Sequence, residues 1–187
     1  IGGEGLAARG MGMTGAALLA ALAALHGGAG RVLLALLDDG ATTALASSPE
    51  LMLRRLEAID LAQASVVCGC GGGAAVAAAL PRVLTQAHRL VLDADALYAI
   101  AADAALQNLL TARAQRSACT TVLTPHPLEA ARLLASTAAA VQADRLGAAN
   151  ALARRFGCTV VLKGSGSIVA APGQTPRINS TGNARLA

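Results

Sequence analysis

The sequence predicts a single α/β domain in which helices cover both faces of a mostly parallel sheet. The first observation is an alternation along the 187 residues between short apolar runs and longer stretches rich in Ala, Leu and Arg. Such alternation is typical of parallel sheets, whose strands are buried on both faces and therefore read as continuous apolar runs. The second observation is that glycine and proline stand where helices are expected to end and begin.

Six apolar runs are predicted to be strands, because they are rich in Val and Leu and are bounded by turn-forming residues. They are residues 31–37, 65–69, 89–95, 120–124, 158–164 and 166–172. Helical periodicity is clearest at residues 14–26, 74–86, 127–134 and 141–156, and the stretch "ALYAIAADAAL" after Asp95 is expected to form a further helix. Gly27, Gly28 and Gly157 stand at predicted helix ends, and Pro127 stands at a predicted helix start.

Both ends of the sequence look cut inside an element. The chain opens on Ile-Gly-Gly, which we interpret as the last residue of an apolar strand and its glycine turn. It closes on "INSTGNARLA", a turn-forming cluster followed by only a few residues. We therefore expect one domain, residues 1–187, truncated at both ends.

Composition argues against several classes of protein. The charge-free stretches 11–30 and 61–81 approach spanning length but are built on Ala and Gly, so buried elements explain them better than membrane insertion. Aromatic residues make up 1% of the chain and the arginines are scattered, which argues against nucleic-acid binding. The net charge of +4 suits a small anionic ligand. The four cysteines match neither a zinc site nor a disulfide scaffold, so we expect buried, reduced thiols in a cytoplasmic protein.

Ligands of open α/β sheets bind beyond the carboxyl ends of the strands, so the residues that follow each strand are the candidates. After residues 65–67 comes Cys-Gly-Cys-Gly-Gly-Gly, whose glycines Gly69, Gly71 and Gly73 lead into a helix and favour an anion. After residues 89–92 come Asp93 and Asp95, whose alternation places both carboxylates on the same side. Asp95 is read equally well as a helix cap or as a contact to a ligand or metal-bound water.

A histidine and a lysine follow the next two strands. His126 stands between two prolines in "TVLTPHPLEAARLL", which predicts an extended residue at the mouth of the sheet, beside a helix that begins at Pro127 and carries Glu129 in its first turn. Lys163 is the one lysine of the chain, in "KGSGS", and a flexible ammonium suits a phosphate group. A surface histidine and a solvated turn lysine are the alternative readings. Because all these motifs fall on one edge of one sheet, they predict a cleft that handles phosphate.

At this point the residues resemble a known family. The blocks "GMTGAALLAALAALHGGAGRV", "VVCGCGGG", "VLDADAL", "VLTPHPLEAARLL", "VVLKGSGSIVAAP" and "INSTGNA" occur in the order seen in the bacterial NAD(P)H-hydrate dehydratases. The resemblance covers essentially the whole chain and implies a three-layer, ribokinase-like α/β/α fold. It also implies ADP-dependent removal of water from hydrated NADH or NADPH, releasing AMP and phosphate. ADP, or ATP in its place, and Mg²⁺ are the implied cofactors, and a homo-oligomer is expected.

The resemblance also assigns roles to individual residues. Ala16, Gly71 and His126 are implied to face the hydrated dinucleotide. The nucleotide is implied to lie against residues 163–167, namely Lys163, Gly164, Ser165, Gly166 and Ser167, and Asn183 of "TGNA" is a further candidate. The family's catalytic aspartate is expected beyond Ala187. Tyr98, Leu128 and Cys70 stand where asparagine, glycine and proline are common.

Two other readings remain open from the sequence. The same phosphate cleft serves a ribokinase-like kinase that acts on a vitamin precursor or a sugar alcohol. A fragment that binds nucleotide without the catalytic base is the non-enzymatic alternative. A redox dinucleotide enzyme is poorly supported, because no G-x-G-x-x-G follows the first strand.

Overall fold

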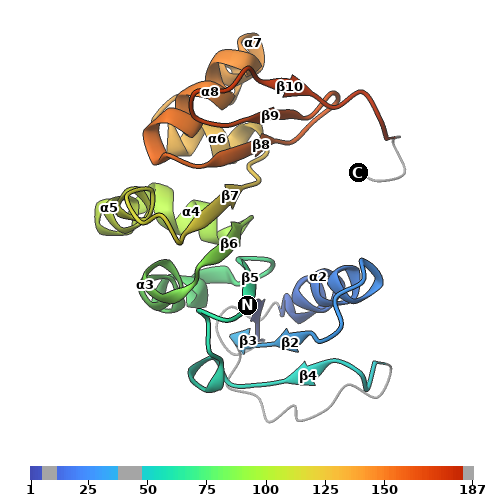
Figure 1. The fold of residues 1–187 in the computed structure, drawn as a ribbon. Coiled ribbons are helices and arrows are strands. Elements are labelled where there is room, and N and C mark those ends of the chain that lie inside the picture. Colours follow the sequence, from blue (N-terminus) through green and yellow to red (C-terminus); the bar gives the residue numbers. More distant parts are fainter. Residues whose placement is uncertain (6–11, 38–47, 183–187) are drawn as a thin grey trace.

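The computed structural model describes residues 1–5, 12–37 and 48–182. Its centre is a six-stranded sheet, with β5 at one edge and β10 at the other (Figure 1). Strands β5 to β8 are parallel to one another, and β9 and β10 are antiparallel to their neighbours. In chain order the six strands are β5 (Ser65–Cys68), β6 (Arg89–Leu92), β7 (Thr120–Leu123), β8 (Thr159–Leu162), β9 (Ile168–Ala170) and β10 (Arg177–Ile178). The mostly parallel sheet predicted from the sequence is confirmed.

The first predicted strand, residues 31–37, is wrong as a single element. It forms two short strands, β2 (Leu33–Leu34), which pairs in parallel with β4 (Met52–Leu53), and β3 (Leu36–Leu37), which pairs in parallel with β1 (Gly2–Glu4). The chain changes partner at Ala35, whose carbonyl accepts a hydrogen bond from the amide of Gly2 at 3.2 Å. The opening glycines therefore belong to a strand, where the sequence predicted a turn.

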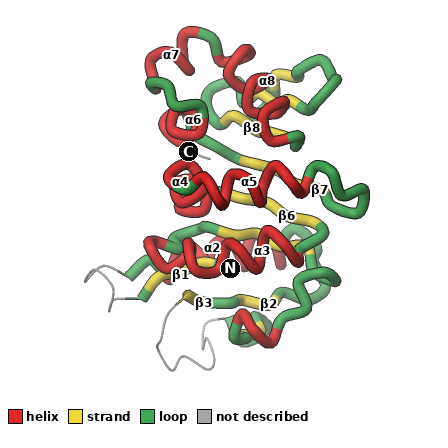
Figure 2. The backbone as a smooth tube through the Cα atoms, turned by 90° about the vertical axis from the view of Figure 1, so that its left-hand side faces the viewer, coloured by secondary structure: helices red, strands yellow, loops and turns green. Residues whose placement is uncertain are grey.

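Helices lie on both sides of the strands. Helices α3 (Val76–Gln86), α4 (Asp95–Ala102), α5 (Ala104–Arg113), α6 (Pro127–Leu133) and α8 (Arg145–Phe156) cover one face (Figures 1 and 2). Helix α2 (Thr14–His26) lies on the opposite side, against β1 and β2. Helix α7 (Ala138–Ala143) packs on α6, and the 3₁₀ turns η1 (Leu56–Ala58) and η2 (Gly73–Ala75) precede β5 and α3. Within the described ranges, no helix combines the length and apolarity needed to cross a bilayer.

Two aspartates divide stretches that the sequence predicts as continuous helices. The predicted helix 141–156 is broken at Asp144, whose Oδ1 accepts from the amide of Gly147 at 2.8 Å and so caps the start of α8. Asp103 separates α4 from α5 in the same way, because its Oδ1 accepts from the amide of Ala105 at 2.7 Å. Aspartate is a strong N-cap, and here the cap overrides the periodicity of the flanking residues.

The core lies between the sheet and the α3–α8 face. Alternate strand residues point into it, so β5 contributes Val66 and Cys68 and β6 contributes Leu90 and Leu92, all buried. The opposite face of these strands is more open, and Val67 is 40% exposed. The buried face is what holds the strand ends, and hence the site residues, in a fixed relation.

Arg113, at the end of α5, is a buried cation that fastens α5 to the end of α3. Its Nη1 donates to the carbonyl oxygens of Leu84 and Ala87, both at 2.7 Å, and its Nε donates to Thr121 Oγ1 at 3.0 Å. The side chain is only 2% exposed, and burial lowers the pKa of its guanidinium. A cation at a helix C-terminus satisfies carbonyls that have no partner within their own helix.

Replacing Arg113 with Met should lower the free energy of unfolding by about 3 kcal/mol, because two buried carbonyls lose their donor. Urea unfolding followed by circular dichroism measures this difference. Arg154→Met, an exposed position on α8, is the matched control and should change stability by less than about 0.5 kcal/mol. Equal stability of the two variants would contradict the role given to Arg113.

The four cysteines are free thiols; Cys68 and Cys158 are buried as the sequence predicts, whereas Cys70 and Cys119 are only half-buried. Burial raises the pKa of Cys68 to about 11 and that of Cys158 to about 12. Since the thiolate is the nucleophile, a raised pKa leaves both groups protonated and unreactive at neutral pH.

Cys68 and Cys158 should therefore resist iodoacetamide in the folded protein at pH 8 and react once urea unfolds it, as peptide mass spectrometry can measure. Rapid labelling of Cys68 in the folded protein would show that this strand is not packed as described.

Candidate functional site

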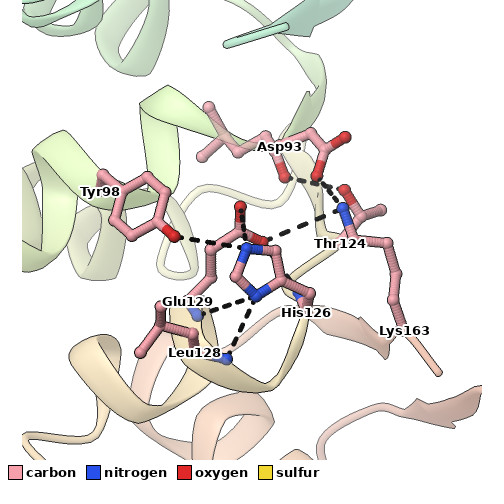
Figure 3. A network of polar contacts seen from close by, with 8 residues as sticks. Asp93, Tyr98, Thr124, His126, Leu128, Glu129 and Lys163 are labelled. Atoms are coloured by element: carbon pink, nitrogen blue, oxygen red, sulfur yellow. Dashed lines mark hydrogen bonds and ion pairs between the residues drawn. The ribbon is translucent and has the colours of Figure 1, made fainter. Parts of the chain in front are cut away.

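The site lies at the edge of the sheet where the parallel strands end. Asp93 follows β6, Thr124 follows β7 and Lys163 follows β8, so neighbouring strands deliver these side chains to one place. Figure 3 shows them converging with Tyr98, His126 and Glu129. The register is fixed by backbone bonds at the same edge, because the amide of Thr124 donates to Leu92 O at 3.1 Å.

Lys163 lies between two carboxylates. Its Nζ is 2.6 Å from Asp93 Oδ1 and 3.9 Å from Glu129 Oε2, and its backbone amide donates to Pro125 O at 2.8 Å. The lysine side chain is 40% exposed and that of Asp93 is 28% exposed, so both remain accessible. This contact brings Asp93 and Lys163 together at the edge of the sheet.

His126 is held as the N-cap of α6, which begins at Pro127 as predicted. Its Nδ1 accepts hydrogen bonds from the amides of Leu128 at 3.1 Å and Glu129 at 3.4 Å. Because Nδ1 serves as an acceptor, the neutral ring carries its proton on Nε2. Nε2 lies 3.2 Å from Glu129 Oε1 and 3.3 Å from the Tyr98 hydroxyl, while the side chain is 40% exposed. The ring is therefore fixed at the mouth of the sheet, with its Nε2–H directed at the Glu129 carboxylate and the Tyr98 hydroxyl.

Glu129 connects the histidine to the lysine, and sequence reasoning missed this role. Its carboxylate accepts from the His126 amide at 2.8 Å through Oε2, the oxygen that also faces Lys163, while Oε1 faces the imidazole. The residue is 2% exposed. The available signal was the H-x-x-E spacing before an apolar run, a capping box in which histidine replaces the usual Ser or Thr.

Tyr98 and Arg132 extend the network along α4 and α6. The ring centroids of Tyr98 and His126 are 6.2 Å apart in an edge-on arrangement, and the Arg132 guanidinium lies 4.4 Å above the Tyr98 ring. A cation over an aromatic face is attracted by the ring quadrupole. Tyr98 is thereby held against the imidazole, another contact that the sequence alone did not indicate.

The glycine loop brings Ala16 to the same edge. Gly71 has φ +61°, and a Cβ there would lie 2.9 Å from the Cβ of Ala16 and 2.5 Å from Met13 O, so glycine is required on both counts. Gly69 packs directly on the backbone carbonyl of Asp93. The loop therefore adjoins Asp93 at Gly69 and the start of α2 at Gly71. Burial, and after it Asp93, raises the pKa of the Cys70 thiol in this loop.

The helix start beyond this loop is already occupied by protein carboxylates. Asp95 Oδ2 accepts from the amide of Gly73 at 2.9 Å, and Glu4 Oε1 accepts from the amide of Ala74 at 3.0 Å. The sequence left Asp95 as a cap of its own helix or a ligand contact, but it caps the start of η2 and α3, a different segment. The prediction that Asp95 lies on the same side as Asp93 is wrong. The regular alternation of the strand ends because the chain turns at Ala94, where φ is +50°. The two amides are therefore not open to an anion.

The second candidate loop connects β8 to β9. Gly164 and Ser165 are exposed, and Ser167 Oγ donates to Gly164 O at 3.1 Å. Arg145 at the start of α8 reaches this loop, with Nη1 2.6 Å from Ser165 O. Asn183 lies outside the described residues. In the described part of the chain no group of three or more His, Cys, Asp or Glu side chains forms a metal site.

A cavity of about 760 Å³ lies between α2, β2, β4 and β5. Its walls are largely Ala, Val and Leu side chains, and it reaches the loop only at Cys70. It is separate from the polar network, because neither His126 nor Lys163 lines it. We therefore define the candidate site by its convergent polar groups and not by cavity volume.

The fold and this strand-end site define a class of α/β proteins that is found among solved structures. A ribokinase-like superfamily protein from Enterococcus faecalis superposes with a TM-score of 0.67 at 23% identity, over 91% of this chain and 60% of that one. The chain therefore has the ribokinase-like fold predicted from its sequence.

More specific similarities identify the family. A family model described as NAD(P)H-hydrate dehydratase matches residues 9–187. The chain is 42% identical over 184 residues to the ADP-dependent (S)-NAD(P)H-hydrate dehydratase of Neisseria meningitidis, covering 94% of this chain and 60% of that protein. It is 36% identical over 183 residues to the bifunctional NAD(P)H-hydrate repair enzyme of Escherichia coli, covering 94% and 33%. The chain belongs to the NAD(P)H-hydrate dehydratase family.

One solved relative was crystallised with a nucleotide. The ADP/ATP-dependent NAD(P)H-hydrate dehydratase of Bacillus subtilis, co-crystallised with ATP and Mg²⁺, superposes with a TM-score of 0.67 at 27% identity. The superposition covers 93% of this chain and 62% of that one. The chain thus spans about 60% of the length of its Neisseria meningitidis relative and 62% of the Bacillus subtilis protein.

Replacing Glu129 with Gln should free the imidazole and lower the free energy of unfolding by about 1–3 kcal/mol, because one amide group then faces donors at a buried position. Thermal unfolding measures the stability change, and the ¹⁵N shift of the His126 Nε2 atom measures the loss of its carboxylate partner. Glu57→Gln, at an exposed position, is the matched control. An unchanged His126 ring spectrum in Glu129→Gln would contradict the assigned network.

Proposed function

We propose that the chain supplies the substrate and nucleotide contacts of an ADP-dependent NAD(P)H-hydrate dehydratase. The observation that carries this proposal is the continuous network from His126 through Glu129 to Lys163 and Asp93, at the strand ends of a chain that belongs to this family. The relatives named above act with ADP or were crystallised with ATP and Mg²⁺. Activity, substrate and partners are proposals for this chain, because it spans only about 60% of the first relative.

The reaction we propose has two steps. A phosphoryl group passes from ADP to the hydroxyl of the hydrated nicotinamide ring, which breaks the P–O bond to AMP, while the hydroxyl loses its proton to a base. The carbon–oxygen bond then breaks, phosphate leaves with the electron pair, the ring nitrogen donates its lone pair, and loss of a ring proton restores NADH or NADPH. Phosphorylation is required because hydroxide is a poor leaving group, and the protein mainly positions the reactants and stabilises charge.

We assign the substrate side to His126, Ala16 and Gly71. The His126 ring is 40% exposed and its orientation is fixed by the cap on Nδ1, so it would face the substrate. Ala16 and Gly71 have almost no side chain, so the backbone of the glycine loop can approach a flat ring closely. The base is proposed to be an aspartate beyond Ala187, as the resemblance implies.

We assign the nucleotide side to residues 163–167. Lys163 supplies a cation, and the exposed Gly164 and Ser165 supply backbone donors. Mg²⁺ usually binds through substrate phosphates and one or two carboxylates, so it would arrive with the nucleotide, near Asp93 and Glu129. When bound it would neutralise phosphate charge. A cytoplasmic location is also proposed, supported by the free thiols. Assembly into a homo-oligomer is proposed from exposed apolar side chains, among them Leu19 and Ile178.

The test of this proposal is turnover. Full-length protein incubated with hydrated NADH and ADP should restore NADH absorbance, whereas a panel of sugar alcohols and vitamin precursors with ATP should give no product. Turnover of an alcohol but not of the hydrate would instead support the kinase alternative. Nucleotide binding with no turnover by either route would favour a binding fragment.

Two substitutions divide the site into its proposed halves. His126→Ala should lower kcat/KM for the hydrate by about 10²-fold, because it removes a ring that positions the substrate. Lys163→Met should mainly raise KM for ADP, by about tenfold, because it removes a charge that faces phosphate. Arg154→Met is the control for both and should leave the kinetics unchanged. This division would be contradicted if each substitution changed kcat/KM for the hydrate and KM for ADP by the same factor.

A further inference from the structure

Arg145 is a cation that contacts the proposed nucleotide loop only through backbone carbonyls. Its Nη1 lies 2.6 Å from Ser165 O, and its Nη2 lies 3.4 Å from both Leu162 O and Lys163 O. The residue is the first of α8, whose N-cap is Asp144. The guanidinium therefore cross-links the start of a 12-residue helix to the loop between β8 and β9.

The contact determines which way the peptide groups of the loop face. All described peptide bonds are trans, and in a trans peptide the C=O and the following N–H point in opposite directions. Because the carbonyls of Lys163 and Ser165 turn toward the guanidinium, the amides of Gly164 and Gly166 turn away from it. Neither amide has an acceptor among the described residues.

The loop backbone requires glycine for this arrangement. Gly164 has φ +143°, and a Cβ there would lie 2.8 Å from Arg145 Nη2. Gly166 has φ +63°. Successive backbone N–H groups that point to the same side form a concave site for anions.

From these contacts we infer that Arg145 is a positioning residue, which orients the amides of Gly164 and Gly166 toward the phosphate of the bound nucleotide. The inference rests on the proposed nucleotide site and adds the residue that shapes it. Arg145 acts through the backbone and does not touch the phosphate itself. The guanidinium has several N–H donors in one plane, so it can contact three carbonyl oxygens that lie in different directions. A lysine ammonium is a compact charge that cannot reach all three equally well.

The test compares two substitutions at this position in the 187-residue chain, with AMP and ADP as probes in titration calorimetry. Arg145→Met should raise the Kd for AMP by about tenfold or more, since it frees the carbonyls to turn. Arg145→Lys keeps the charge but not the fork, and should raise the Kd by about fivefold. Arg154→Met, on the same helix but exposed, should stay within about twofold of the original chain.

A second measurement separates loop orientation from folding. In the unsubstituted chain, the ¹H–¹⁵N signals of Gly164 and Gly166 should shift when AMP or inorganic phosphate is added. In Arg145→Met these two signals should no longer respond, while the signal of Gly71, in the other loop, keeps its position. If the Gly71 signal also moved in Arg145→Met, the substitution would have unfolded the chain generally, and a local role of Arg145 would be overturned.

The outcomes distinguish this inference from the proposed function. If the unsubstituted chain binds neither AMP nor ADP, the proposed nucleotide site fails and the inference fails with it. If that chain binds AMP and Arg145→Lys or Arg145→Met binds it equally well, only the role of Arg145 is overturned. Binding without any response of the Gly164 and Gly166 amides would likewise overturn it.

Discussion

The carboxylate of Glu129 is the group on which the geometry of the site depends. It is 2% exposed, accepts from the backbone of His126, faces the imidazole and stands 3.9 Å from the Lys163 ammonium. Removing the partners of a buried carboxylate costs several kcal/mol, so the carboxylate and its donors are held together. Because His126 and Lys163 come from the ends of β7 and β8, this one group also keeps the two proposed halves of the site in register.

The ion pair between Lys163 and Asp93 has a different character. The lysine is 40% exposed, and exposed ion pairs contribute on the order of 1 kcal/mol or less to stability. The pair is therefore too weak to be needed for folding. Its value lies in keeping the lysine extended at the strand ends. Glu129 is held more firmly than Asp93, because it has two further donors from His126.

The sequence allowed local features to be predicted and left the distant contacts unseen. The parallel strands, the start of α6 at Pro127 and the fixing of His126 all follow from apolar runs and from proline geometry, which act over a few residues. The breaks at Asp103 and Asp144 do not follow from periodicity, because an aspartate N-cap competes with the apolar pattern of the residues around it. The bonds of Asp95 to Gly73 and of Glu4 to Ala74 join residues 22 and 70 positions apart, so no local pattern announces them.

The two glycine loops differ in a way that their composition does not indicate. Both contain glycines with positive φ, and both follow a parallel strand at the same sheet edge. In the loop after β5, the amides that open the next helical segment already donate to Asp95 and Glu4. In the loop after β8, Arg145 satisfies the carbonyls of Lys163 and Ser165, while the amides of Gly164 and Gly166 have no acceptor among the described residues. In the first loop, protein carboxylates already accept from the backbone N–H groups, so this loop suits a neutral ligand surface. In the second loop, a guanidinium donates to the carbonyls, so backbone N–H groups remain for an anion.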